Sequence, residues 1–199
     1  MKTRSRYVSN SSSTSFLIAY NDISVFECMK NERGYETMMK WIKNDDVPTS
    51  DEISEFFRDL VESFADQYGE SYYMKLHPEK KRIFYDYRMY WTLSEEIGKY
   101  CLGDGIDSMV EDFASSVKKT VENWGDDEEF YDWMVSEKLE DVIDMLTIQI
   151  VNAVEKKWKH IWRTEVEDSN DFGYYMEQEF MPYVISHCEG IAGSSINNH

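Results

Sequence analysis

The segment from Asp126 to Arg163 contains no Gly or Pro, the two residues that most often end a helix. Apolar residues recur along it at helical spacings of three and four positions, from Phe130 to Trp162. We therefore predict one long helix over 127–163, which would extend about 55 Å if unbroken. A break near Ser136, where the apolar stripe weakens, is the alternative. This helix is expected to be the spine of the fold.

The same segment changes from acidic to basic along its length. The part from 126 to 144 carries nine acidic side chains against one basic residue, Lys138. A helix dipole favours anions at its N-terminus and cations at its C-terminus, so it explains most of this polarity without any function. The acids from 137 to 144 lie beyond the first turn of the predicted helix, where the dipole has little effect. The candidate binding residues are Asp126, Asp127, Glu128, Glu129, Asp132, Glu137, Glu140, Asp141 and Asp144.

A row of carboxylates on a helix can imitate nucleic acid. Side chains four residues apart lie about 6 Å from each other, a spacing similar to that of successive phosphates. The net charge of −18 repels phosphates and anionic lipids, so neither nucleic acid nor a membrane is expected as a direct partner. The expected partner is a basic surface of another protein, such as a host protein that handles nucleic acid. The alternative is a solvated face that serves solubility alone.

The C-terminal end of the segment carries a basic cluster interleaved with tryptophans. Basic and aromatic residues in alternation can bind nucleic acid. We favour a structural role, as a helix C-terminal cap and in ion pairs with the chain's own acids or with a second copy in a homo-oligomer. The basic residues are Lys156, Lys157, Lys159, His160 and Arg163.

The N-terminal leader runs Arg6-Tyr-Val-Ser-Asn-Ser-Ser-Ser-Thr-Ser-Phe16. This string resembles the opening of many uncharacterised small proteins of tailed bacteriophages and prophages. The resemblance covers only the start of the chain and implies phage origin, but it implies no activity and assigns no functional residue. It places the protein in the cytoplasm of the host cell, or in the virion if the protein is structural.

Strand signals occur in two places. Phe16–Tyr20 has strand character, and 71–91 alternates around a turn at His77-Pro78, which predicts a β-hairpin. An isolated hairpin is marginal, so Phe16–Tyr20 is expected to be its third strand. A helix over 71–91 is the alternative, because several intervening positions are also apolar.

Helix signals account for most of the remaining chain. Thr49 with Glu52, and Thr92 with Glu95, fit capping boxes. A helix is predicted after each box, and the first of these is expected to end near Gly69. Further helices are predicted over 21–30, 34–43 and 106–124. A last helix is predicted after Asp168, and Pro182 is expected to end or kink it. The predicted fold is mainly α with a small antiparallel sheet. The predicted organisation is a leader and first strand over 1–20, one domain over 21–189 and a polar tail over 190–199.

Motifs for metals, cofactors and catalysis are weak. The three cysteines are far apart without a CxxC pair, which favours neither a disulfide framework nor a zinc site and is typical of a reducing compartment. Residues 168–179 match an EF-hand loop in part, but Phe172 stands where a ligand is needed, so we favour a capped helix start over a calcium site. The calcium candidates are Asp168, Asn170 and Glu179.

Catalytic and cofactor signals are weaker still. The acid pairs Glu62 with Asp66 and Glu140 with Asp144 share helix faces by composition alone, and His187-Cys188 would need a partner from elsewhere. No cofactor motif is found, so none is expected. The leading hypothesis is a non-enzymatic inhibitor that acts by protein contact. The alternatives are a virion or assembly component and an enzyme with an unrecognised carboxylate site.

Overall fold

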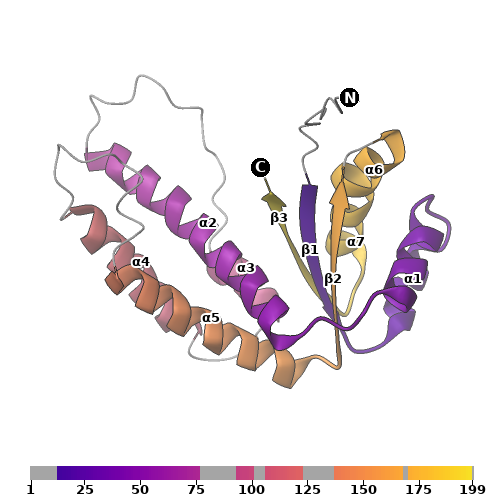
Figure 1. Ribbon diagram of the computed structural model, residues 1–199, viewed down its shortest axis with the longest axis horizontal. Coiled ribbons are helices and arrows are strands. Elements are labelled where there is room, and N and C mark those ends of the chain that lie inside the picture. The colour runs from indigo at the N-terminus through magenta and orange to yellow at the C-terminus, as the bar shows by residue number, and fades with distance from the viewer. Residues whose placement is uncertain (1–12, 77–92, 101–105, 123–136, 168–169, 199) are drawn as a thin grey trace, which may run out of the picture. The chain divides into compact units, whose positions relative to one another are not determined.

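The computed structural model of the protein describes residues 13–76, 93–100, 106–122, 137–167 and 170–198. The chain is mainly α-helical with a small antiparallel sheet, which confirms the predicted fold class (Figure 1). It divides into two units. Unit 1 comprises Met1–Val47 and Ile161–His199, and unit 2, Pro48–His160, is inserted between these segments. The division differs from the single domain predicted over 21–189.

Unit 1 is built on a three-stranded sheet in the order β2-β1-β3. The strands are β1 (Ser13–Tyr20), β2 (His160–Glu167) and β3 (Ile191–Asn198). The central strand β1 runs antiparallel to both neighbours (Figure 1), and its register with β3 pairs Ser13 with Asn198 and Tyr20 with Ile191. Strand β1 is therefore hydrogen-bonded on both edges by segments that follow it by more than a hundred residues.

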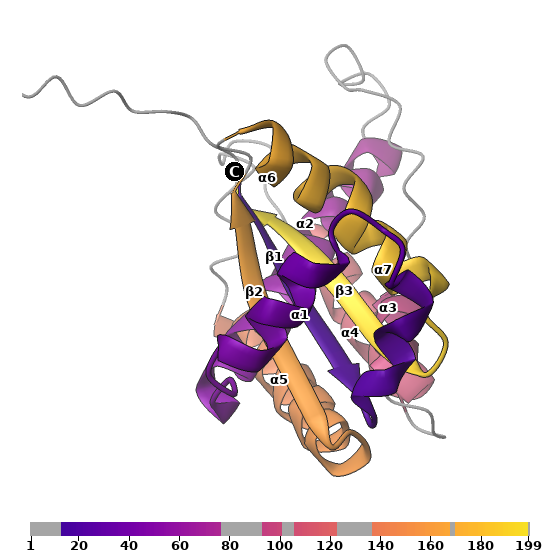
Figure 2. The same ribbon diagram turned by 90° about the vertical axis from the view of Figure 1, so that its right-hand side faces the viewer.

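Short helices cover one face of this sheet (Figure 2). They are η1 (Ile23–Met29), α1 (Tyr35–Asn44), α6 (Asp171–Tyr175), the π-helical turn η4 (Met176–Phe180) and α7 (Met181–His187). Alternate residues of the strands point into the core that the helices close. This core includes Phe16, Ile18 and Tyr20 of β1, Trp162 and Val166 of β2, and Phe26, Met38, Phe180 and Val184 of the helices.

Unit 2 is helical in its described residues. It contains α2 (Ser50–Leu76), α3 (Leu93–Tyr100), α4 (Ile106–Glu122) and α5 (Glu137–Lys157), with α2, α4 and α5 packed against one another and α3 packed against α4 and α5. Buried residues repeat at helical spacing on each long helix, as the predicted stripes require. These residues include Ile53, Phe57 and Val61 of α2, Phe113 and Val117 of α4, and Ile143, Leu146, Ile150 and Val154 of α5.

The capping box predicted at Thr49 is present, whereas the box predicted at Thr92 lies outside the described residues. The backbone N–H of Thr49 donates to Oε2 of Glu52 at 2.7 Å, and the N–H of Glu52 reaches Oγ1 of Thr49 at 3.3 Å. This reciprocal pair is the predicted capping box at the start of α2. Asp22 likewise caps the helix predicted over 21–30, by accepting from the N–H of Ser24 at 2.9 Å, although that helix is 3₁₀ rather than α.

The predicted long helix is wrong at its C-terminal end. Helix α5 ends at Lys157, and the chain continues as strand β2 from His160. The apolar spacing of Trp158, Ile161 and Trp162 fits a helix as well as a strand, and hydrogen bonding to β1 selects the strand. The N-terminal part of the prediction, 127–136, lies outside the described residues.

The predicted hairpin and tail are corrected as well. Residues 71–76 continue α2 past Gly69, so the first hairpin strand is wrong, and 77–91 lie outside the described residues. The polar tail predicted over 190–199 instead forms β3 through 198. Pro182 does not end the last helix, because the chain stays helical from Asp171 to His187, and the irregularity near it is the π-helical turn η4 that precedes it.

Candidate protein-interaction surface

Helix α5 separates a buried face from an exposed one. Ile143, Leu146, Ile150 and Val154 are buried, and α5 packs against α2 and α4. Because a helix repeats every 3.6 residues, positions 141, 144, 145 and 148 form a continuous row on a different face. We call Asp141, Asp144, Met145 and Ile148 the α5 stripe; all four side chains are exposed.

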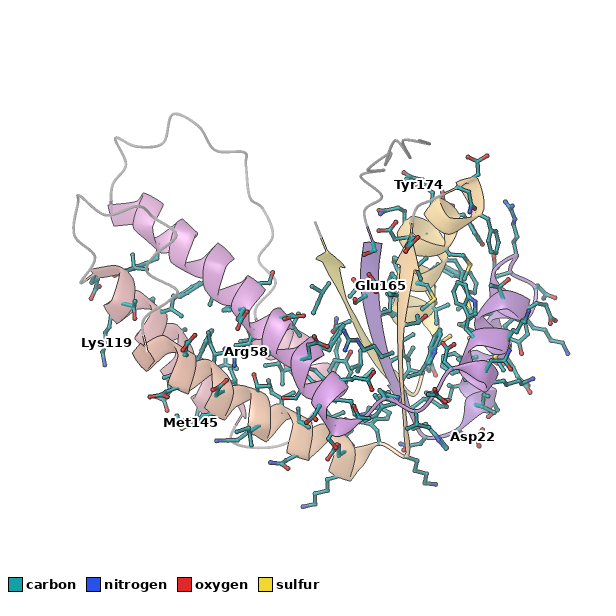
Figure 3. All side chains as sticks on the ribbon, viewed as in Figure 1. Asp22, Arg58, Lys119, Met145, Glu165 and Tyr174 are labelled. Atoms are coloured by element: carbon teal, nitrogen blue, oxygen red, sulfur yellow. The ribbon has the colours of Figure 1, made fainter. Side chains whose placement is uncertain are left out.

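The α5 stripe joins two carboxylates to two large apolar side chains. Met145 is 58% exposed and Ile148 is 57% exposed, although both lie in the middle of a regular helix. Figure 3 shows Met145 on the side of α5 that points away from α2. Single exposed apolar residues are ordinary, but two neighbours beside charged groups are typical of a contact surface. Methionine also adapts its shape to a partner.

One member of the stripe is partly neutralised by α2. The guanidinium of Arg58 is ion-paired with Asp144 and, at 2.7 Å, with Glu62 on its own helix. Partial burial lowers the pKa of Arg58, but the carboxylates of Glu62 and Asp144 outweigh this effect and raise it above its usual value. Arg58 therefore stays charged, and Asp141 is the more available acid of the stripe.

The helix dipole accounts for part of the remaining charge. Helix α5 is described from Glu137 onward, and the residues just before it lie outside the described part of the chain, so the prediction that the acids from 137 to 144 lie beyond the first turn stays a prediction. Lys156 and Lys157 lie in the last turn, as a dipole-stabilising role requires. Among the predicted acids from 137 to 144, Asp141 and Asp144 are the two that belong to the α5 stripe.

The predicted candidate residues fall into three groups. Asp126 to Asp132 lie outside the described residues, and of Glu137 only the backbone is described. Glu140, Asp141 and Asp144 lie exposed on α5. Of the basic cluster, Lys159, His160 and Arg163 follow α5 instead of ending it, so the structure does not place the cluster on one helix face.

The capped helix start expected after Asp168 is present at Asn170. The Asn170 side chain accepts hydrogen bonds from the N–H groups of Phe172 and Gly173, both at 3.0 Å, and so caps α6. Residues 171–180 are helical and Glu179 is exposed, which is incompatible with an EF-hand loop wrapped around an ion. Asp168 lies outside the described residues. Among those described, no group of His, Cys, Asp or Glu residues is arranged to hold a metal.

Several members of the pairs weighed as catalytic have other partners, and the side chain of Asp66 is not among those described. Glu62 and Asp144 each face Arg58, and Nδ1 of His187 lies 2.8 Å from Oγ of Ser186. Cys188 instead has its sulfur against the sulfur of Cys28.

None of the helices in the described part of the chain is long and apolar enough to cross a bilayer.

Two features of the structure were not predicted from the sequence. Met145 and Ile148 are apolar, like the residues of the stripe predicted along the spine, but they lie on another face of the helix. Their spacing from Leu146 could have predicted this. The second is a buried contact in unit 1, in which Oγ1 of Thr14 donates to Oε1 of Glu177 at 2.5 Å. The other carboxylate oxygen of Glu177 has no hydrogen-bond partner among the described residues, and no sequence signal links these two positions.

The α5 stripe combines charge, exposed apolar area and a rigid helical support, which together suit binding rather than a buried reaction centre. Searches against protein-family models, curated proteins and solved structures found no match for this chain.

Proposed function

We propose that this protein acts by contact, not catalysis, and that the α5 stripe binds a basic surface on another protein. The observation that carries the proposal is the row Asp141, Asp144, Met145 and Ile148 on one exposed helix face. Its acids would attract lysine or arginine side chains, and its apolar residues would fill a shallow pocket between them. The net charge of −18 would steer such a partner from a distance.

The leader's resemblance to small phage proteins supplies the biological setting of the proposal. In that setting the partner is a host protein that handles nucleic acid, and binding of the acidic helix blocks its basic site. A pure imitation of phosphates would need an unbroken row of charges. Met145 and Ile148 interrupt such a row, so the proposed contact is mixed acidic and apolar.

The first prediction concerns salt and charge. Immobilised protein is used to capture partners from host lysate at low and high salt, in parallel with the double variant Asp141→Asn, Asp144→Asn. Capture should fall steeply with salt, because the screening length drops from about 10 Å at 0.1 M to about 3 Å at 1 M. The variant should retain clearly less partner at low salt. Bound partner should also be displaced by added duplex DNA if its nucleic-acid site is the one occupied.

The matched control is Glu111→Gln with Asp112→Asn, which removes the same charge from exposed positions on α4. Equal losses from both double variants would show that net charge alone drives binding and would refute the stripe.

Met145→Ser with Ile148→Ser should weaken binding about tenfold or more, as loss of a contact worth about 1.4 kcal/mol would. Arg58→Gln, which releases Asp144 and Glu62, should strengthen capture at low salt.

A further inference from the structure

Two free cysteines from distant parts of the sequence meet in unit 1. The sulfur atoms of Cys28 and Cys188 lie 3.0 Å apart. A disulfide bond is about 2.05 Å long, so about 1 Å of sulfur movement would close the gap.

The surrounding fold holds both residues in place. Cys28 lies on η1, which is anchored in the core by Phe26 and Met29. Cys188 ends α7, and its backbone N–H donates to the carbonyl of Val184 at 3.0 Å. The meeting of the two thiols is therefore a consequence of core packing.

The turn after Cys188 lies against η1 as well. Gly190 has a φ of +82°, a conformation that favours glycine, and it leads the chain into β3. A Cβ atom at this glycine would come within 3.4 Å of the Val25 side chain. The carbonyl of Val25 also accepts from the Cys28 thiol at 3.2 Å.

We propose that Cys28 and Cys188 are a redox modification site and form an intramolecular disulfide when a small-molecule disulfide such as oxidised glutathione is present. In the reducing compartment expected from the cysteine content, the two remain thiols. Oxidation would tie the N-terminal segment of unit 1 to its C-terminal segment. These segments flank the inserted unit 2.

The reaction proceeds by two thiol–disulfide exchanges. The Cys28 thiolate attacks one sulfur of the small disulfide, whose S–S bond breaks and releases one thiol after protonation. Cys188 then loses its proton to solvent and attacks the Cys28 sulfur, which expels the second thiol. The two protein thiols lose two electrons and two protons in total, and the small disulfide is reduced to two thiols.

The environments of the two sulfurs assign the order of these steps. Cys28 is exposed and reaches the oxidant, whereas Cys188 is 7% exposed. Burial, reinforced by the adjacent Cys28, raises the pKa of Cys188 to about 12. Because the thiolate is the attacking species, Cys28 reacts first and Cys188 resolves the mixed disulfide.

The test uses the full chain with Cys101→Ser, which leaves Cys28 and Cys188 as its two cysteines. Protein is incubated with oxidised glutathione and unfolded in an alkylating reagent, and its remaining thiols are counted by mass spectrometry. We expect loss of both thiols, no retained glutathione and a digest peptide linking Cys28 to Cys188. The melting temperature should rise by several degrees, since a cross-link that spans 160 residues restricts the unfolded chain, and dithiothreitol should reverse the rise.

Single variants separate this mechanism from general thiol reactivity. Cys188→Ser should stop at a glutathione adduct on Cys28, and Cys28→Ser should stay unmodified because its remaining thiol is buried. A stable adduct on both cysteines, a cross-link between two chains, or two free thiols after oxidation would each overturn the proposal. Cys28→Ser changes an exposed side chain and should leave the core intact. The lack of reaction at Cys188 in this variant would therefore reflect burial of that thiol and not unfolding.

Discussion

Phe57→Ala should lower the free energy of unfolding of unit 2 by about 3–5 kcal/mol, the largest effect we expect from a single substitution. Phe57 is fully buried, and its ring meets that of Tyr100 edge-on, with 5.1 Å between centroids. It also meets Phe56 in the same manner at 5.7 Å. Removing the ring leaves a cavity between helices that cannot close without moving both neighbours. Native domains have only about 5–15 kcal/mol of stability in total.

Urea unfolding followed by circular dichroism would measure this loss, and hydrogen exchange would locate it in α2, α3 and α4. The matched control is Met145→Ala, which also truncates a large apolar side chain but at an exposed position of unit 2. It should change stability by no more than about 0.5 kcal/mol. A loss below about 1 kcal/mol for Phe57→Ala would contradict its place in the core.

Gly34→Ala should destabilise unit 1 by about 1–3 kcal/mol through overpacking. A Cβ atom at this position would lie 2.5 Å from Cγ of Phe180 and 2.6 Å from Cδ1 of the same ring. The ring is 2% exposed, and because protein cores are densely packed it can move aside only by displacing its neighbours. Gly34 itself has φ −83° and ψ −15°, which any residue adopts, so the requirement for glycine here is one of space.

Gly98→Ala is the matched comparison, because a Cβ there meets no atom of the described residues within 4 Å. Gly98 lies inside α3, where alanine is favoured over glycine by about 0.5–1 kcal/mol, so this variant should be more stable than the wild type. Phe180→Leu should partly rescue Gly34→Ala, and the double variant should lose less than the sum of the two single losses. Thermal melts that rank both glycine variants equally would disprove the close contact with Phe180.

The inferred interaction surface was only partly accessible from sequence. The acidic row on the predicted spine identified Asp141 and Asp144, because charge and helical spacing are both local properties. The ion pair of Asp144 with Arg58 was not predictable, since its partner lies 86 positions away on α2. The contact of Cys28 with Cys188 was not predictable for the same reason, because no spacing rule connects residues 160 positions apart.

The sequence by itself determined the helices and their caps. The helix over 106–124 and the capping box at Thr49 were both predicted, because helix hydrogen bonds join residues only four positions apart. Strand β1 was also predicted, since Phe16 to Tyr20 is apolar enough to be buried on both faces.

Only the tertiary structure decided the sheet and the division into units. Strand β2 has a helix-like spacing, and β3 consists largely of Gly, Ser and Asn residues that have little strand preference. Both become strands because β1, far away in the sequence, supplies their hydrogen-bond partners. The same long-range pairing brings the two ends of the chain into unit 1 and leaves 48–160 as an insertion, an arrangement that no local pattern encodes.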